Sequence, residues 1–148
     1  MEPVVVRIRA VDARDIAFAD EISAMHRVCF HYDIGPATLD AGFWWIGVDQ
    51  DGEPACFGGM WPSTSDPENG GYLCRAGVMP IYRGLGLQRR LIRVREIAAR
   101  RLGWRTMVSD TCDNAFSANN FIDAGYRMFE PSKPWAVDGS CYWRKDLR

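Results

Sequence analysis

Two glycines between a predicted strand and a predicted helix constrain this sequence more than any other feature. Residues 72–78 are predicted to form the strand, and residues 84–101 the helix, with apolar side chains along one face. The first N–H groups of a helix have no acceptor within the helix, and the helix dipole adds partial positive charge there. Because Gly84 and Gly86 let the backbone approach a ligand closely, the segment predicts a cradle for pyrophosphate. A tight corner between strand and helix would use the same two glycines.

Two better-known phosphate motifs are excluded by the same segment. A P-loop requires Gly-Lys followed by Ser or Thr, and no such triplet occurs in the chain. In a dinucleotide-binding fingerprint the third glycine would stand where this sequence has Arg89. The predicted anion cradle therefore belongs to neither class.

Strand and helix patterns alternate along the whole chain. Asp12 is predicted to cap the first helix, and Asp51 and Gly52 are predicted to form a hairpin turn. Mixed strands and helices in this order predict an α+β fold, layered with helices on both sides of a central sheet. The predicted strands cover residues 4–8, 43–48, 55–61, 72–78, 104–109, 126–129 and 141–145, and the predicted helices cover residues 13–29, 84–101 and 114–124, with a short helical turn before residue 43.

Length and composition indicate one globular domain over residues 1–148. Hydrophobic residues make up 47% of the chain and charged residues 25%, which is ordinary for a soluble protein. The net charge of −1 provides no basic field for nucleic acid or an anionic membrane, and no apolar run could span a bilayer. The five cysteines show no CxxC pair and no zinc spacing, and the N-terminus has no signal-peptide pattern. We therefore expect a reduced, cytoplasmic setting and no metal site.

Two motifs resemble the signatures of the GNAT N-acetyltransferases. The first, Val-x-Pro-x-x-Arg-Gly-x-Gly before a long helix, is matched in register by Val78, Pro80, Arg83, Gly84 and Gly86. The second places an Asn, a small residue, an aromatic residue and a Gly-aromatic pair at fixed spacing, and it is matched by Asn114, Ser117, Phe121, Gly125 and Tyr126. The resemblance covers nearly the whole chain. It implies the GNAT fold, a mixed, mostly antiparallel sheet of about seven strands, flanked by helices on both faces and splayed between the fourth and fifth strands.

The same resemblance implies acetyl-coenzyme A as the cosubstrate. The backbone N–H of Ala76 would polarise the acetyl carbonyl, and the strand edge at Ala76, Gly77 and Val78 would pair with the pantetheine. Residues on the last helix would also contact the coenzyme, namely Asn114, Ser117 and Phe121. The pyrophosphate would be held by backbone N–H groups of Arg83, Gly84, Leu85, Gly86, Leu87 and Gln88.

The sequence departs from the family at both positions that would handle protons. Many members place a proton-donating tyrosine where this chain has Phe121, and some place a glutamate base where it has Tyr72. A water chain, Tyr72 or Asp110 could relay the amine's proton, so Tyr72, Asp110 and the N–H of Ala76 are the catalytic candidates. The structural alternatives are a packed strand aromatic for Tyr72 and a cap of the following turn for Asp110.

The acceptor amine is expected near the first helix and the strand at residues 43–48. Phe30, His31, Tyr32 and Trp44 are the candidates for binding it. Core packing is an equal interpretation of the three apolar aromatics, and a surface position is the alternative for the histidine.

These observations predict transfer of an acetyl group from acetyl-coenzyme A to a primary amine of a small molecule, directly within a ternary complex. The alternative is a non-catalytic module that binds acetyl-coenzyme A as a sensor, which Phe121 and the missing glutamate motivate. A third interpretation keeps the fold but uses another acyl donor. Aromatic residues near Trp135 and Trp143 would permit a homodimer.

Overall fold

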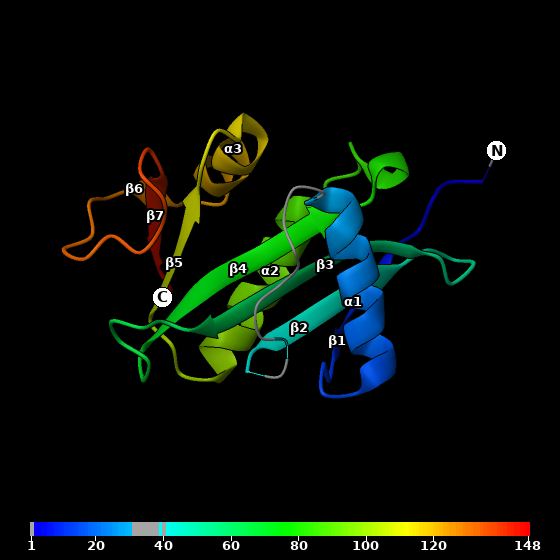
Figure 1. The fold of residues 1–148 in the computed structure, drawn as a ribbon, viewed down its shortest axis with the longest axis horizontal. Helices are drawn as coiled ribbons and strands as arrows, with labels where there is room; N and C mark the ends of the chain where they lie inside the picture. The colour runs from blue at the N-terminus through cyan, green and yellow to red at the C-terminus, as the bar shows by residue number, and fades with distance from the viewer. Residues whose placement is uncertain (1, 31–38, 40) are drawn as a thin grey trace. The chain divides into compact units, whose positions relative to one another are not determined.

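Seven strands in one mixed sheet form the framework of this protein. The computed structural model describes residues 2–30, 39 and 41–148. The strands follow the order β1-β2-β3-β4-β5-β7-β6 (Figure 1). The elements are β1 (Arg7–Val11), α1 (Ile16–Cys29), β2 (Phe43–Val48), β3 (Pro54–Pro62), β4 (Gly70–Val78), the 3-10 helix η1 (Pro80–Tyr82), α2 (Leu87–Arg101), β5 (Thr106–Thr111), α3 (Ala115–Asp123), β6 (Arg127–Met128) and β7 (Cys141–Asp146). The predicted α+β fold is confirmed.

Antiparallel pairing dominates the sheet. β1 with β2, β2 with β3, β5 with β7, and β6 with β7 are antiparallel pairs. β4 and β5 run parallel, from the pair Gly70 and Thr106 to the pair Tyr72 and Val108. The ladder ends there, although β4 continues to Val78.

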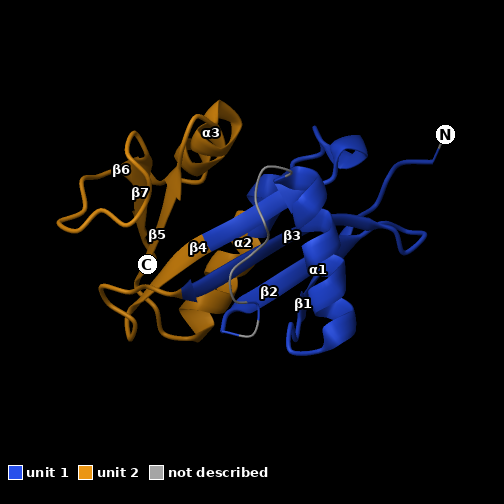
Figure 2. Ribbon diagram, viewed as in Figure 1, with its two compact units in different colours: residues 1–61, 74–91 blue, residues 62–73, 92–148 orange. Residues whose placement is uncertain are grey.

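The chain divides into two compact units, coloured separately in Figure 2. Unit 1 comprises residues 1–61 and 74–91, and thus β1, α1, β2, most of β3 and the end of β4. Unit 2 comprises residues 62–73 and 92–148, and thus the start of β4, most of α2, and the elements from β5 to β7. β4 and α2 therefore contribute residues to both units.

Unit 1 packs α1 closely against its strands. Ile22, Met25 and His26 form the buried face of the helix. A Cβ atom built on Gly77 of β4 would lie 2.7 Å from the ring of Phe57 and 2.8 Å from the Sγ of Cys29. A side chain at position 77 would therefore push α1 away from β4, next to the strand edge expected to bind the coenzyme.

Helix α1 begins at Ile16, and its cap is Asp15 rather than the predicted Asp12. The Oδ1 of Asp15 accepts the N–H of Ala17 at 3.0 Å. Asp12 instead forms an ion pair with Arg14 at 2.9 Å, and its carbonyl accepts the N–H of Asp15 in a turn before the helix. Aspartate is a favourable N-cap residue at either position, but the turn from Asp12 to Asp15 delays the start of the helix, so Asp15 is the cap.

Two strand boundaries also differ from the prediction. β1 occupies Arg7–Val11 rather than residues 4–8, because pairing with β2 selects that stretch of the chain. β5 begins at Thr106 rather than at residue 104, because the N–H of Trp104 donates to the carbonyl of Ala99 at 3.0 Å and closes the end of α2. The helical turn expected before residue 43 falls mostly outside the described residues.

A buried polar network ties three elements of unit 2 together. The hydroxyl of Tyr126 and the Nζ of Lys145 donate to Glu96 at 2.8 and 3.1 Å. Lys145 also donates to the carbonyl of Ala124, at the end of α3, at 2.7 Å. Burial raises the pKa of Tyr126, so its hydroxyl remains a donor over the whole neutral range. The network fixes α3 and β7 to α2.

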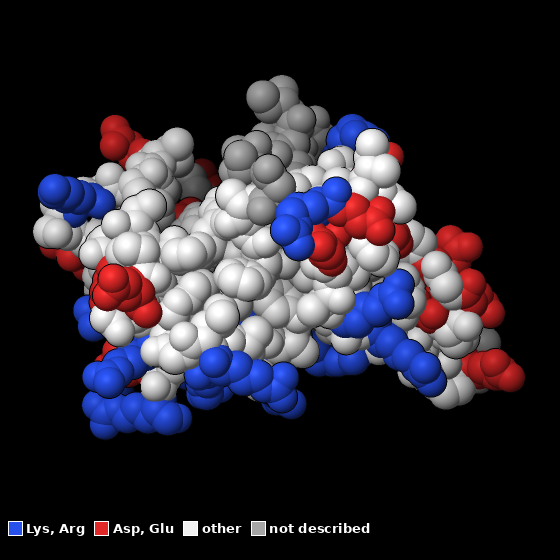
Figure 3. All heavy atoms as spheres, turned by 90° about the horizontal axis from the view of Figure 1, so that it is seen from below, with Lys and Arg blue, Asp and Glu red and all other residues white. Residues whose placement is uncertain are grey.

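Charges of both signs occupy the surface. On the face drawn in Figure 3, groups of basic and acidic side chains border an area without formal charge. This distribution agrees with a net charge of −1. Within the described part of the chain, no helix is both long and apolar enough to cross a membrane.

We predict that Asp15→Ala lowers the free energy of unfolding by about 1 kcal/mol, because the Ala17 N–H loses its acceptor. Urea denaturation followed by circular dichroism measures this loss. Asp20→Ala, on the exposed face of the same helix, is the control and should change stability little. Equal losses in the two variants would contradict the assigned cap.

Candidate active site

β4 leads into α2 through a backbone that glycine adopts most easily. Gly84 and Gly86 have φ angles of +83° and +74°, so the helix begins at Leu87 rather than at residue 84. The N–H of Arg90 donates to the carbonyl of Gly86 at 3.2 Å, which makes Gly86 the cap of α2. Because glycine has no side chain to accept the first N–H groups of the helix, those of Leu87 and Gln88 are left for another acceptor.

The turn has room for an anion. A Cβ atom built on Gly84 or Gly86 would meet no atom of the described residues within 4 Å. The first turn of α2 also carries no acidic residue. The N–H of Arg83 already donates to the carbonyl of Pro80 at 3.3 Å, so the predicted cradle reduces to residues 84–88. A helix start of this kind suits an anion such as a phosphate.

A hydrogen bond anchors the turn to the hairpin between β2 and β3. The hydroxyl of Tyr82 donates to the Oδ2 of Asp49 at 2.6 Å, and the Oδ1 of Asp49 accepts the N–H groups of Asp51 and Glu53. The bond raises the pKa of Tyr82 to about 12 and lowers the pKa of Asp49. At neutral pH the proton therefore stays on Tyr82, and η1 stays fastened to the hairpin.

The strand edge predicted to bind pantetheine forms the end of β4. Ala76 is half-buried, whereas Gly77 and Val78 are buried. The Sγ of Cys29 lies 3.6 Å from the carbonyl oxygen of Val78. Burial raises the pKa of the Cys29 thiol, so this cysteine is a poor nucleophile and serves in packing.

Two catalytic candidates, Tyr72 and Asp110, are in direct contact within unit 2. The hydroxyl of Tyr72 donates to the Oδ2 of Asp110 at 2.6 Å. Tyr72 pairs with Val108, and Asp110 follows two residues later on the same face of β5. Both residues are partly exposed. The contact means that Asp110 does more than cap a turn.

Trp135 completes the pair, although no sequence motif assigns it to the site. Its Nε1 donates to the same Oδ2 of Asp110 at 2.8 Å. Its ring lies edge-on to Tyr72, at a centroid distance of 6.1 Å. Trp135 belongs to the irregular segment between β6 and β7, where no periodic pattern relates it to β5. A tryptophan in a polar loop was the one available signal.

The Asn and Ser of the second motif form the start of α3. The Oδ1 of Asn114 accepts the N–H of Ser117 at 3.0 Å and caps the helix. The amide nitrogen of Asn114 and the hydroxyl of Ser117 remain the groups that suit coenzyme contacts. Cap formation alone accounts for an asparagine at this position.

The aromatic residues and glycine of the same motif form the end of α3. Gly125 has a φ of +94°, and its backbone N–H donates to the carbonyl of Ile122. The backbone N–H of Tyr126 donates to the carbonyl of Phe121. Phe121 is 8% exposed and packs against Tyr126 and Trp143, at centroid distances of 5.1 and 6.2 Å. Phe121 is therefore a core residue of unit 2 with no proton to donate.

Two of the four acceptor candidates, His31 and Tyr32, lie outside the described residues. Trp44 is 1% exposed, and its ring covers Gly59, where an added Cβ would lie 2.7 Å away. Core packing accounts for Trp44. The ring of Phe30 stacks on the imidazole of the buried His26 of α1, at a centroid distance of 4.7 Å, and remains partly exposed.

Trp135 and Trp143, near the predicted dimer surface, differ in their exposure to solvent. Trp143 is 3% exposed, and its indole N–H donates to the Oγ1 of Thr111 at 2.9 Å. The ring of Trp143 is therefore not available for a dimer surface, because this side of β7 faces the core. Trp135 is 38% exposed.

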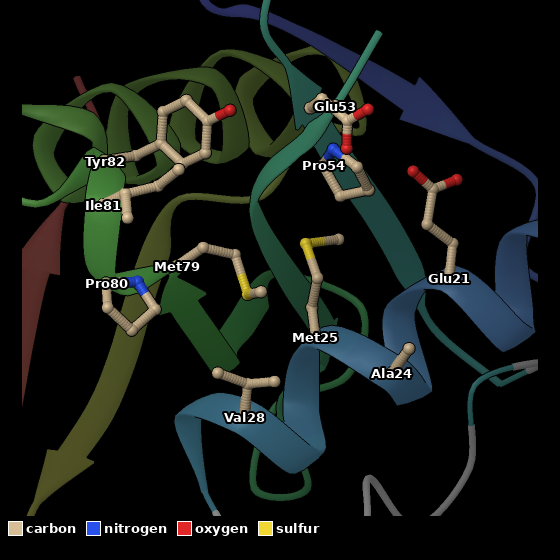
Figure 4. Close-up of a pocket in the computed structure, with 10 residues that line it drawn as sticks. All are labelled: Glu21, Ala24, Met25, Val28, Glu53, Pro54, Met79, Pro80, Ile81 and Tyr82. Carbon is tan, nitrogen blue, oxygen red and sulfur yellow. The ribbon is translucent and has the colours of Figure 1, made fainter.

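A largely apolar cavity of about 480 Å³ lies beside α1 in unit 1 (Figure 4). None of the residues predicted to bind the coenzyme lines it, but residues 79–82 connect the strand edge to the glycine turn. Two carboxylates stand among its apolar side chains. Its walls are Glu21, Ala24, Met25, Val28, Glu53, Pro54, Met79, Pro80, Ile81 and Tyr82.

The cysteines and acidic residues of the described segments build no metal site. All five cysteines are free thiols. No group of His, Cys, Asp or Glu in these segments has the arrangement needed to hold a metal ion.

The sequence profile of the acetyltransferase (GNAT) family matches residues 10–126, which is more than half of the chain. The chain therefore belongs to this family, and acyl transfer is its class of reaction. No curated protein sequence matches it significantly.

Solved structures from several bacteria share the fold. A candidate acyl-CoA N-acyltransferase from Klebsiella pneumoniae has a TM-score of 0.75 and 21% identity, with 97% of this chain and 98% of that one covered. A candidate GNAT acetyltransferase from Desulfovibrio desulfuricans has a TM-score of 0.77 and 16% identity, with 97% of this chain and 100% of that one covered. A candidate acetyltransferase from Salmonella typhimurium, solved with acetyl-CoA, has a TM-score of 0.71 and 18% identity, with 97% of this chain and 94% of that one covered.

Gly86→Ala and Gly71→Ala are predicted to destabilise the protein for different reasons. At Gly86 the added Cβ meets open space, so only the left-handed backbone is penalised, by roughly 1–2 kcal/mol. At Gly71 it would lie 2.5 Å from the ring of Trp104 and 2.8 Å from the Sδ of Met107, and we expect a loss of about 3 kcal/mol. Urea denaturation compares them. A loss at Gly86 as large as that at Gly71 would show that the turn is filled, not open.

Proposed function

We propose that this chain transfers an acetyl group from acetyl-coenzyme A to a primary amine of a small molecule, directly within a ternary complex. The open, glycine-capped N-terminus of α2 carries the proposal, because it suits a pyrophosphate in a member of an acetyltransferase family. The similar Salmonella protein contains acetyl-CoA. The proposal assigns the activity to one domain, residues 1–148, of a cytoplasmic protein.

The coenzyme is held mainly by backbone groups in this proposal. The N–H groups of residues 84–88 bind the pyrophosphate, and Ala76 to Val78 pair with the pantetheine. Asn114 and Ser117 contribute side-chain contacts from the start of α3. Backbone donors keep their direction without a side-chain rotamer to freeze, so binding loses little conformational entropy.

Acetyl transfer needs a neutral amine, a donor for the developing oxyanion and a path for the amine's protons. The N–H of Ala76 is the proposed oxyanion donor. Asp110 is the proposed proton acceptor, through its Oδ1, while Tyr72 and Trp135 hold its Oδ2. The thioester supplies the acyl group and a thiolate leaving group.

The reaction balances without an acid from the protein. The amine nitrogen bonds to the acetyl carbon, the carbon–sulfur bond breaks, and sulfur leaves as a thiolate. The ammonium gives up two protons through Asp110 to solvent, and the thiolate takes one proton from solvent. The products are an amide, a thiol and one released proton. Phe121 is consistent with this scheme, because a coenzyme A thiolate needs no proton to depart.

Amine-dependent release of coenzyme A thiol tests the proposal. We predict steady-state release on addition of a primary amine, and a kcat/KM at least about tenfold lower in Asp110→Asn, because the proton acceptor is lost. Tyr72→Phe keeps the ring and should cause a smaller loss. Asp20→Asn, on the exposed face of α1, is the matched control for a lost carboxylate and should retain full activity.

The other two interpretations give different results in the same assay. A sensor module would bind acetyl-coenzyme A and release no thiol with any amine in a broad panel, and that outcome would overturn the proposed function. Comparing acetyl-, propionyl- and succinyl-coenzyme A at one amine concentration tests the acyl donor. The proposal predicts the highest kcat/KM for the acetyl group.

A further inference from the structure

One oxygen of Asp110 is held by two hydrogen bonds, and the other accepts none from the described residues. The Oδ2 accepts the hydroxyl of Tyr72 at 2.6 Å and the indole N–H of Trp135 at 2.8 Å. No ion pair joins Asp110 to a basic side chain of the described residues. An ionised carboxylate can accept about four hydrogen bonds, so the Oδ1 retains capacity for a ligand's N–H groups. A ligand that brings its own positive charge suits this oxygen best.

Aromatic rings from three segments gather beside this carboxylate. Trp135 lies 6.1 Å from Tyr72, 4.6 Å from Tyr142 and 6.2 Å from Phe129, as centroid distances. Tyr142 is the direct cross-strand partner of Asp110, so both side chains leave the sheet on the same face. All four rings are at least partly exposed. Ring faces attract ammonium groups, and their area suits an apolar body.

The segment that carries Trp135 is fixed to β7. The hydroxyl of Tyr142 accepts the N–H of Ala136 at 3.1 Å and lies 3.4 Å from its carbonyl oxygen. The N–H of Phe129 donates to the carbonyl of Tyr142 at 3.0 Å. The rings are thus positioned before any ligand arrives, which lowers the entropic penalty of binding.

We propose that Asp110 and the rings of Tyr72, Phe129, Trp135 and Tyr142 form an amine subsite within unit 2. It takes a primary ammonium attached to an apolar or aromatic body. The ammonium donates to the Oδ1 of Asp110, and the body packs against Trp135. This proposal rests on the proposed function and assigns its acceptor class. Trp135 is the specificity-determining residue, because it both contacts the ligand and holds the carboxylate.

Calorimetric titration of 2-phenylethylamine at about pH 7, with and without coenzyme A, tests the subsite without requiring turnover. We expect saturable binding that weakens at least about fivefold in Trp135→Ala and in Asp110→Asn. Trp135→Phe keeps an aromatic ring but loses the N–H bond, and it should fall between Trp135→Ala and the wild type. Val137→Ala removes an exposed apolar side chain from the same segment and should bind as the wild type does. The uncharged analogue 2-phenylethanol should bind at least about fivefold more weakly.

Several outcomes would overturn the subsite. They are unchanged affinity in a folded Trp135→Ala protein, equal affinity for the amine and the alcohol, and no saturable binding in either condition. Loss of a dimer in Trp135→Ala without loss of amine affinity would assign the rings to a second copy of the chain. The proposed function and the subsite can fail separately. Amine binding without thiol release would overturn the proposed function and leave the subsite in place. Turnover of other amines at a rate that Trp135→Ala does not change would overturn the subsite alone.

Discussion

The left-handed backbone at Gly84 and Gly86 is the constraint on which the rest of the site depends. It delays α2 until Leu87 and gives the helix a cap without a side chain. The cap therefore offers the N–H groups of Leu87 and Gln88 no side-chain acceptor, and a Cβ built on Gly84 or Gly86 would meet no atom of the described residues within 4 Å. The bond between Tyr82 and Asp49 keeps the preceding turn in place. An anion at this helix terminus satisfies the free donors and the dipole together.

The two family motifs have different physical causes in this chain. The first motif gives α2 a glycine cap, which offers the first N–H groups of the helix no side-chain acceptor and so suits a binding site. The second satisfies the ends of α3: Asn114 caps its start, and Gly125 closes its end with Tyr126 packed on Phe121. A phenylalanine at position 121 strengthens that core but removes a proton donor. In the proposed reaction, proton transfer is assigned to Asp110 on β5, where two donors already hold one carboxylate oxygen.

Local patterns in the sequence predicted most elements of the fold, and long-range contacts decided the rest. The strand at Phe43–Val48 was predicted at both ends, because its aromatic and β-branched run is bounded by turn residues. The choice between Asp12 and Asp15 as a cap, and the first residue of β5, depended on which hydrogen bonds compete in three dimensions. Tyr72 and Asp110 were each predicted from the sequence, but their contact required the register of β4 with β5. Trp135 had no pattern to place it beside them.

Calorimetric titration of acetyl-coenzyme A into the wild type and Gly86→Glu tests the central claim, the anion cradle at α2, most directly. The variant adds a side chain and a negative charge where the phosphates should lie. Gly52→Glu is the matched control, because Gly52 has a φ of +82° and equally open surroundings at the hairpin tip. We predict binding by the wild type and by Gly52→Glu, and loss of binding in folded Gly86→Glu. Equal affinity in all three proteins, or binding by none, would show that the turn is only a corner between a strand and a helix.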